Sequence, residues 1–273
     1  MDSGQLPTSQ ADIDVTTPSV ARMYDYYLGG TDHYPVDAEA CLQLSRVAPS
    51  TQALAVNNRR FLQRAVRVLA EEEGVRQFLD HGSGLPTQDN VHQVAQRVDR
   101  SSRVVYVDND PIVLAHGRTL LEENDETAVI QADMRATDAI FEHPETRRLL
   151  DPEQPTAALF VSVLHCIPDK DDPGALVRRV ASRLAPGSFV VICHLVSERA
   201  DIREETTRLM LRNTGGNWGR VREPREVERY FEGLDILDPG HLVEVSTWRP
   251  DSELSRSQRT DEWIEYGGIG RVR

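Results

Sequence analysis

The pattern of hydrophobic and polar positions separates a helical N-terminal part of the chain from a longer part with short apolar runs. Aromatic and apolar residues recur at helical spacing over residues 19–28, and Gly29-Gly30 follows as a helix end. A second helical pattern runs from Asn58, a residue type common at helix caps, to about Leu69. The pattern therefore predicts two helices before the first strand.

Beyond residue 74, short apolar runs alternate with helical segments, which is typical of a parallel sheet covered on both faces. Asp110-Pro111 and Asp172-Pro173 each combine a helix-capping acid with a proline at the first helical position. Further helices are expected near residues 201–212 and from Glu223. We predict an α/β fold with a doubly wound, mostly parallel, seven-stranded sheet. The expected strands span residues 76–80, 103–108, 128–131, 157–163, 188–195, 234–237 and 264–272.

Composition narrows the class of protein. The 273 residues are 39% hydrophobic and 27% charged, which is enough for a substantial core. The net charge of −13 would repel phosphate backbones and anionic lipids, so neither nucleic acid nor a membrane is an expected partner. Three widely spaced cysteines, no signal peptide and no apolar stretch of membrane length predict a reduced, cytoplasmic protein.

Acidic residues follow three consecutive predicted strands, and the first of them opens a glycine-spaced loop. Asp80 precedes Gly82 and Gly84 at the carboxyl end of its strand, where ligands of open parallel sheets bind. A dinucleotide loop would have a third glycine where Thr87 stands, and an acid before the loop suits a cation better than a phosphate. The alternative is that these residues only form a tight turn.

The other two acids extend this pattern. Asp108 ends the second strand, where its two oxygens can accept both hydroxyls of a ribose, although it could also cap the next helix. Asp133 lies just past the third strand, where it can accept from an exocyclic amine of a base. Alone, Asp133 would be interpreted as an acid of a surface loop. Together, the acids at the ends of three consecutive strands form a group that suggests a common site.

These motifs resemble those of class I S-adenosylmethionine-dependent methyltransferases. More narrowly, the chain from about residue 18 to residue 272 is similar to the actinobacterial S-adenosyl methyltransferase family, whose members mostly lack an assigned substrate. The resemblance implies a Rossmann-like fold and S-adenosyl-L-methionine as cofactor. Besides the three acids, it rests on the segments 18–30, 58–59, 84–87, 106–111, 162–169 and 176–192.

The resemblance also implies roles for individual residues. Asp80 would face the cofactor's ammonium group, Asp108 would hold the ribose and Asp133 would face the adenine amine. Asn109 and Met134 would lie along the adenine. Pro86 stands where many methyltransferases have a third glycine. The remaining cofactor-binding candidates are the loop residues Gly82, Ser83 and Gly84, which would pass near the methionine part, and Ser162 after the fourth strand.

The residues that follow the fourth strand bear on the methyl acceptor. Ser162-Val163-Leu164-His165 stands where an Asn-Pro-Pro-Tyr motif would suggest methylation of a base or a protein amide, so a small-molecule acceptor is favoured. An acceptor that loses a proton needs a base, and the candidates are His165, His33 and Tyr24, each of which could instead be structural. No metal is predicted. The adjacent pairs His165-Cys166 and Cys193-His194 would each point to opposite faces of a strand and could not easily form one tetrahedral site.

The expected organisation is a disordered tail at residues 1–17, a helical lid or cap at 18–74 and a Rossmann-like methyltransferase domain at 75–273. A helix before the first strand can fold across the strand ends and exclude water, or it can pack as an ordinary amphipathic helix. Two other functions stay open: a non-catalytic S-adenosylmethionine-binding regulatory protein, and a nucleotide-dependent oxidoreductase, against which Thr87 argues. The acceptor and the oligomeric state stay open as well.

Overall fold

The computed structural model describes residues 14–86, 89–120, 124–250 and 262–273, with only the backbone described over 116–120. The predicted tail lies outside these ranges up to residue 13, and so does most of the polar segment that precedes the last strand. Residues 14–17 form a turn in which an oxygen of Asp14 accepts from the backbone N–H of Thr16 (2.7 Å). No helix in the described ranges combines the length and the apolar composition needed to cross a membrane.

From residue 14 onward, three helices rather than the two predicted precede the first strand: α1 (Val20–Tyr27), α2 (Pro35–Val47) and α3 (Thr51–Glu71). The sequence analysis missed α2, which begins at a proline and buries few apolar side chains. It also placed the start of α3 too late. Asn58 is not a cap but a buried residue inside α3, where its amide donates to the Tyr24 hydroxyl (2.9 Å). This tertiary contact outweighs the local preference of asparagine for helix ends.

The predicted sheet is confirmed as a mostly parallel sheet, with the strand order β3-β2-β1-β4-β5-β8-β6. The first five strands along the sheet are parallel, and β8 runs antiparallel to β5. The described residues contain one strand more than predicted, because the two-residue β7 also pairs with β8. The strands are β1 (Gln77–His81), β2 (Arg103–Asp108), β3 (Thr127–Gln131), β4 (Thr156–Val161), β5 (Phe189–Val196), β6 (Asp235–Ile236), β7 (Val243–Glu244) and β8 (Ile264–Arg271).

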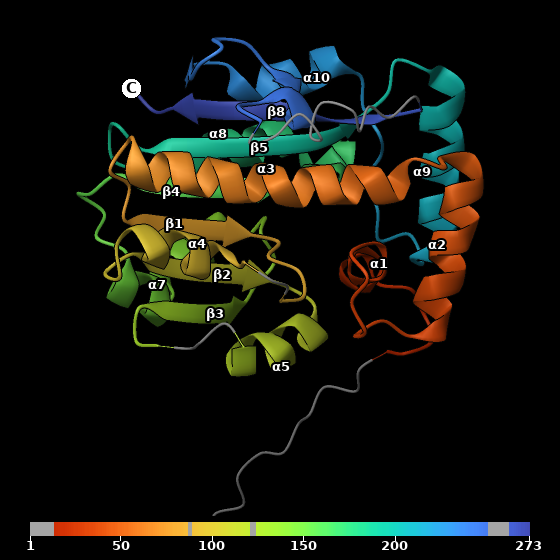
Figure 1. Ribbon diagram of the computed structural model, residues 1–273, viewed down its shortest axis with the longest axis horizontal. Coiled ribbons are helices and arrows are strands. Elements are labelled where there is room, and N and C mark those ends of the chain that lie inside the picture. The colour runs from red at the N-terminus through yellow and green to blue at the C-terminus, as the bar shows by residue number, and fades with distance from the viewer. Residues whose placement is uncertain (1–13, 87–88, 121–123, 251–261) are drawn as a thin grey trace, which may run out of the picture.

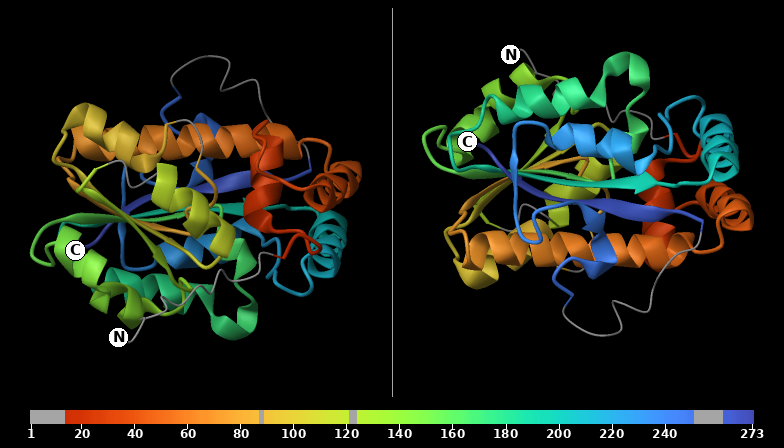
Figure 2. Two further views of the ribbon diagram at one scale, coloured as in Figure 1. Left: turned by 90° about the horizontal axis from the view of Figure 1, so that it is seen from below. Right: turned by 90° about the horizontal axis from the view of Figure 1, so that it is seen from above.

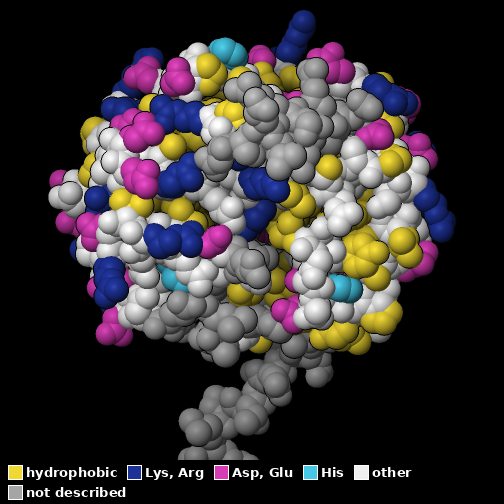
Figure 3. Space-filling model, in the orientation of Figure 1, with side chains coloured by type: hydrophobic (Ala, Val, Ile, Leu, Met, Phe, Trp, Pro, Cys, Tyr) yellow, Lys and Arg dark blue, Asp and Glu magenta, His cyan; other side chains and the backbone are white. Residues whose placement is uncertain are grey.

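Helices cover both faces of this sheet. On one face α3 and α4 pack against the strands, and α6, α7 and α8 pack on the other, so α3 and α8 lie on opposite sides (Figure 2). The short helices α6 and α7 were not predicted, because six residues are too few to display a period. Acidic and basic side chains are interspersed over the face that carries α3 (Figure 3). The remaining helices are α4 (Val91–Val98), α5 (Pro111–Leu120), α6 (Thr137–Glu142), α7 (Pro144–Leu149), α8 (Pro173–Ala181), α9 (Ala200–Asn213) and α10 (Pro224–Glu228).

A third apolar cluster lies beyond the carboxyl ends of the parallel strands. There α1, α2 and α9 gather at one end of the molecule (Figure 1), joined by the first turns of α3 and by Trp218 and Trp263. A buried ion pair between Arg22 and Asp37 (2.7 Å) ties α1 to α2. The helical group therefore stands opposite the strand ends at which the sequence places its acidic residues.

Candidate functional site

A cavity of about 710 Å³ lies between the strand ends and the helical group. The loops after β1, β2, β3 and β4 line it, together with residues of α1, α3, α9 and β8. Small-molecule sites span roughly 300–1,000 Å³, so this volume suits one. We call the end formed by Asp80, Gly82, Gly84 and Asp108 the acidic end. We call the end formed by Leu54, Leu195, Met210, Trp218 and Trp263 the aromatic end.

The loop after β1 approaches its neighbours so closely that a side chain would not fit. Gly82 has φ +71°, and a Cβ built on it would lie 2.6 Å from a methyl carbon of Val163. Gly84 has φ +66° but open space around it. The Ser83 hydroxyl is buried and has no hydrogen-bond partner within the described ranges. The loop thus lines the cavity with its backbone and leaves one polar side chain without a partner, which fits the predicted approach of a ligand.

Asp108 is held in a fixed orientation by the backbone around it. Its two oxygens accept from the N–H groups of Gly84 and Asp110, each at 2.9 Å. Burial raises its pKa, and those two hydrogen bonds oppose the shift. Asp110 caps α5 by accepting from the N–H of Ile112 (3.0 Å) and also accepts from the Ser19 hydroxyl (2.6 Å). The capping role that Asp108 could have had belongs to Asp110, and the Asp108 carboxylate faces the cavity.

Asp80 is a buried carboxyl group whose ionised form is disfavoured by its surroundings. It is 5% exposed, and burial raises its pKa to about 7, with the charge of Arg59 opposing the shift and that of Asp108 adding to it. A cation in the cavity would favour its ionised form. The acidic end therefore has the negative charge and the hydrogen-bond acceptors expected for an ammonium or sulfonium group beside a ribose.

The remaining cofactor candidates also line the cavity. Asp133 is paired with Arg135, whose Nε lies 2.9 Å and 3.0 Å from its two oxygens, and this hydrogen bonding lowers the pKa of Asp133. Asn109 is exposed, whereas Met134 is half-buried with its terminal methyl beside Gly82. Ser162 has φ +58° and donates its hydroxyl hydrogen bond to Glu265.

The structure brings two of the three base candidates into the cavity. His165 and Tyr24 line it, but burial and the positive charge of Arg222 lower the pKa of His165 to about 3, and burial raises that of Tyr24. His33 lies elsewhere, outside the cavity lining, with its Nδ1 3.1 Å from Asp25 and its ring against Tyr26. His33 is thus placed as part of the turn after α1.

Glu265 is a site residue that the sequence analysis missed. It lies on β8, is 2% exposed and lines the cavity, and burial raises its pKa to about 7. Besides Ser162, it accepts from the thiol of Cys193 (2.8 Å), which also lies 3.1 Å from the Asn58 amide oxygen. The available signal was a single acid inside an otherwise apolar, glycine-rich strand. Glu265 and Asp80 are thus two buried carboxyl groups that titrate near neutral pH.

Within the described ranges, no group of three or more His, Cys, Asp or Glu side chains is arranged to hold a metal ion. His194 is instead bound on both ring nitrogens, with Nδ1 2.8 Å from the Leu195 carbonyl oxygen and Nε2 3.1 Å from Arg222. The cavity can therefore position an organic cation and a neighbouring apolar molecule, and it can accept a proton.

Comparison with known proteins agrees with this chemistry. A family model described as S-adenosyl methyltransferase matches residues 7–273, and no curated protein matches the chain. A DUF574 family protein from Streptomyces avermitilis is 38% identical, with a TM-score of 0.88 over 96% of this chain and 100% of the other. A candidate methyltransferase from Thermobifida fusca is 36% identical, with a TM-score of 0.86 over 98% and 100%. The chain belongs to the S-adenosyl methyltransferase family, and it is an enzyme with S-adenosyl-L-methionine as its cofactor.

Proposed function

We propose that the enzyme transfers the methyl group of S-adenosyl-L-methionine to a small-molecule acceptor that binds in the same cavity. The observation that carries this proposal is the continuity of the cavity: a single lining includes Asp80 and Asp108 at the acidic end and Trp218 and Trp263 at the aromatic end. The acidic end suits a charged nucleoside, whereas the aromatic end suits an apolar molecule. The acceptor is therefore expected beside the cofactor rather than on the outer surface.

At the acidic end, we assign Asp108 to the ribose hydroxyls and Asp80 to the ammonium group. Asp133, Asn109 and Met134 would surround the adenine, with Asp133 shared between the adenine amine and Arg135. Gly82, Ser83, Gly84 and Ser162 would surround the methionine part. When bound, the cofactor supplies an electrophilic methyl group on a positively charged sulfur.

The protein positions the acceptor beside the methyl group and provides a side chain that can take up the acceptor's proton. Holding an acceptor in line with the methyl group can contribute roughly 7–11 kcal/mol through effective concentration alone. For an acceptor that loses a proton, Glu265 suits the task better than His165. The pKa of Glu265 lies near 7, where a general base works best, whereas the pKa of His165 near 3 leaves it a weak base. Tyr24 is assigned to positioning, because its hydroxyl donates to the Ala55 carbonyl (3.1 Å).

We also propose that the helical segment 18–74 is a lid whose mobile part is α1 with α2. The contacts of α1 support this role: Ser19 reaches Asp110 beside the acidic end, and the Arg22–Asp37 pair would carry α2 along. Gly29-Gly30 forms an ordered turn, since a Cβ on Gly30 would overlap the Asp25 carboxylate. The three free cysteines support a reducing, cytoplasmic location.

The first experiment is thermal unfolding with S-adenosylmethionine, with its demethylated product S-adenosylhomocysteine, and with NAD as a control. A ligand at about 100 times its dissociation constant adds about 2.7 kcal/mol to the free energy of unfolding. Shifts with the first two ligands, followed by product formation with members of an acceptor panel, would support the proposal. Turnover confined to a protein or nucleic-acid acceptor would contradict it.

A further inference from the structure

Two polar atoms at the aromatic end of the cavity have no visible partner. Trp218 and His165 are 4% and 2% exposed and both line the cavity. Within the described part of the chain, neither Nε1 of Trp218 nor Nδ1 of His165 makes a hydrogen bond. Their rings pack against each other, with centroids 4.8 Å apart and planes at 47°. Buried polar groups without partners are rare and costly, so this pair calls for a ligand.

The backbone around the pair is built to keep the two rings together. Gly219 lies against the segment after β4 so closely that a Cβ would stand 2.4 Å from the Ile167 carbonyl oxygen and 2.6 Å from that of His165. Only a residue without a side chain allows this contact. The neighbouring Trp218 is thereby brought beside His165, although the two residues are more than fifty positions apart in the chain.

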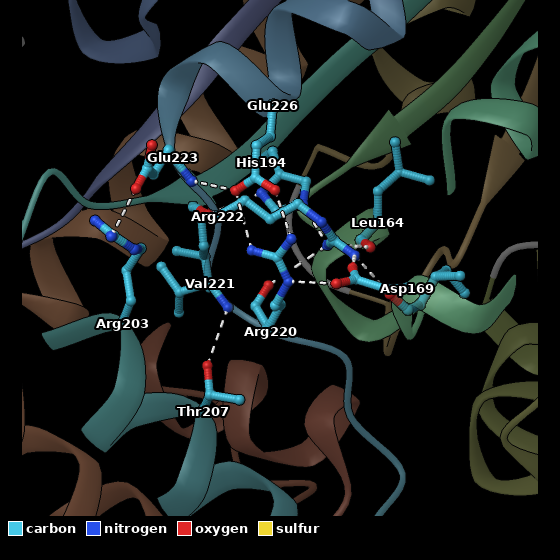
Figure 4. A network of polar contacts seen from close by, with 12 residues as sticks. Leu164, Asp169, His194, Arg203, Thr207, Arg220, Val221, Arg222, Glu223 and Glu226 are labelled. Carbon is cyan, nitrogen blue, oxygen red and sulfur yellow. Dashed lines mark hydrogen bonds and ion pairs between the residues drawn. The ribbon is translucent and has the colours of Figure 1, made fainter. Parts of the chain in front are cut away.

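A buried arginine fixes the same two segments (Figure 4). Arg222 is 1% exposed and donates to the carbonyl oxygens of Leu164 (3.3 Å) and Ile167 (2.9 Å), and to Asp169 (2.7 Å). It also lies 3.1 Å from Nε2 of His194. Arg220 adds a second bond to Asp169 (2.7 Å). These contacts hold the wall in place without using the free atoms of His165 and Trp218.

The surroundings limit what the free atoms can bind. Leu54, Leu195 and Met210 are apolar and buried, and they line this end of the cavity together with Trp263. His165 is neutral near pH 7, since burial and Arg222 lower its pKa to about 3. An indole N–H can only donate, whereas a neutral imidazole nitrogen without a proton accepts. A hydroxyl group can accept from the indole N–H and, whichever ring nitrogen of His165 carries the proton, can either donate to Nδ1 or accept from it.

We infer that the aromatic end binds a neutral, planar aromatic acceptor whose hydroxyl group lies between Nε1 of Trp218 and Nδ1 of His165. This inference rests on the proposed function, because it names the class of acceptor for the same cavity. The hydroxyl satisfies both buried atoms at once, and the flat apolar body fills the space among the leucine, methionine and tryptophan side chains. A carboxylate is disfavoured, since the buried apolar side chains of Leu54, Leu195 and Met210 would leave its charge without solvation.

The test uses the full chain saturated with S-adenosylhomocysteine and three probes that differ in one group: 2-naphthol, naphthalene and 2-naphthoate. Dissociation constants are measured by ligand-observed NMR. We expect 2-naphthol to bind about tenfold more tightly than either of the others. In Trp218→Phe, which keeps an aromatic ring but loses the N–H group, the preference over naphthalene should fall below threefold. Trp263→Phe removes an indole from the same cavity and should keep the preference.

A second measurement does not depend on the folding of a variant. In the unmutated protein labelled with ¹³C and ¹⁵N, the indole N–H signal of Trp218, assigned by through-bond experiments on the same sample, should move with 2-naphthol and not with naphthalene. Equal binding of the three probes, tighter binding of 2-naphthoate, or a preference retained by Trp218→Phe would overturn the inference. Failure of S-adenosylhomocysteine to bind would instead count against the proposed function.

Discussion

The acidic and aromatic ends of the cavity differ in how far apart their residues lie in the chain. The acidic end comes from the turns after β1 and β2, which are neighbouring parallel strands, and its residues span positions 80 to 108. The aromatic end draws on α3, β5, α9 and the segment before β8, from position 54 to position 263. The residues of the aromatic end are all buried, whereas Gly82, Gly84 and Asp108 at the acidic end are half-buried, and only the acidic end is compact in sequence.

This difference follows from the architecture. Consecutive parallel strands deliver their carboxyl ends to one edge of the sheet, so any polar residue that follows such a strand arrives at the same place. The aromatic end has no such rule, because its residues meet only after helices have packed and β8 has inserted antiparallel to β5. A cofactor site of this kind can be expected from local patterns, whereas an acceptor site requires the folded chain.

The largest effect is expected where the acidic end depends on a close backbone approach. Gly82→Ala introduces a side chain at φ +71° and 2.6 Å from Val163. The backbone strain costs about 1–3 kcal/mol and the crowding about as much again, so the free energy of unfolding should fall by about 2–6 kcal/mol. Chemical denaturation measures this, together with calorimetric titration of S-adenosylmethionine.

Gly84→Ala is the matched control for this substitution. It has a similar backbone angle, φ +66°, but nothing within 4 Å of the added carbon. Its cost should be limited to backbone strain. Equal losses in the two variants would show that the approach of Gly82 to Val163 is not what shapes the loop.

The next effect concerns the ribose assignment. Asp108→Ala should weaken S-adenosylmethionine binding by about 1–3 kcal/mol, because the ribose hydroxyls and the N–H groups of Gly84 and Asp110 lose their acceptor. Asp133→Ala is the comparison variant and should cost less, since that carboxylate is half-exposed and already paired with Arg135. Calorimetric titration of both variants decides the assignment, and a larger loss in Asp133→Ala would reverse it.

Strands and loops followed the sequence patterns more closely than helices did. The observed β2 has the predicted bounds, and the other long strands begin and end within two residues of the prediction. Asn58 misled the helix prediction because its polar side chain is used inside the fold, between Tyr24 and Cys193. Glu265 had one local signal, its place as the single acid of a glycine-rich strand, whereas nothing near Trp218 in the sequence marks the cavity that it lines.

The pH dependence of S-adenosylmethionine binding should distinguish the buried carboxyl groups of Asp80 and Glu265, with an effect of intermediate size. Asp80 has its pKa raised to about 7, with Arg59 and Asp108 as its charged neighbours, so it is largely protonated below that pH in the free protein. The cofactor's ammonium group favours the ionised form, so binding releases a proton and weakens as the pH falls through 7. Between pH 7.5 and pH 6 the dissociation constant for S-adenosylmethionine should rise about tenfold.

Two variants assign this pH dependence. Asp80→Asn should bind the cofactor less tightly at pH 7.5 and lose most of the change with pH. Glu265→Gln removes the other carboxyl group with a pKa near 7 but leaves the acidic end intact, so it should keep the dependence. A dependence that disappears in Glu265→Gln and persists in Asp80→Asn would place the cofactor's charge toward β8 and away from β1.

The smallest effect is expected at His33, which sequence analysis grouped with the base candidates. Its ring bonds to Asp25 and packs on Tyr26 outside the cavity lining. His33→Ala should therefore cost about 1 kcal/mol of stability through the lost hydrogen bond. Turnover and the dissociation constant of S-adenosylmethionine should change less than twofold. Steady-state kinetics with an acceptor from the panel measures turnover.

A large fall in kcat for His33→Ala with unchanged cofactor binding would mean that the turn after α1 moves into the cavity during the reaction. In that case the helical segment 18–74 would supply a catalytic group. The cavity would then have three functional parts: the acidic end, the aromatic end and a mobile turn after α1.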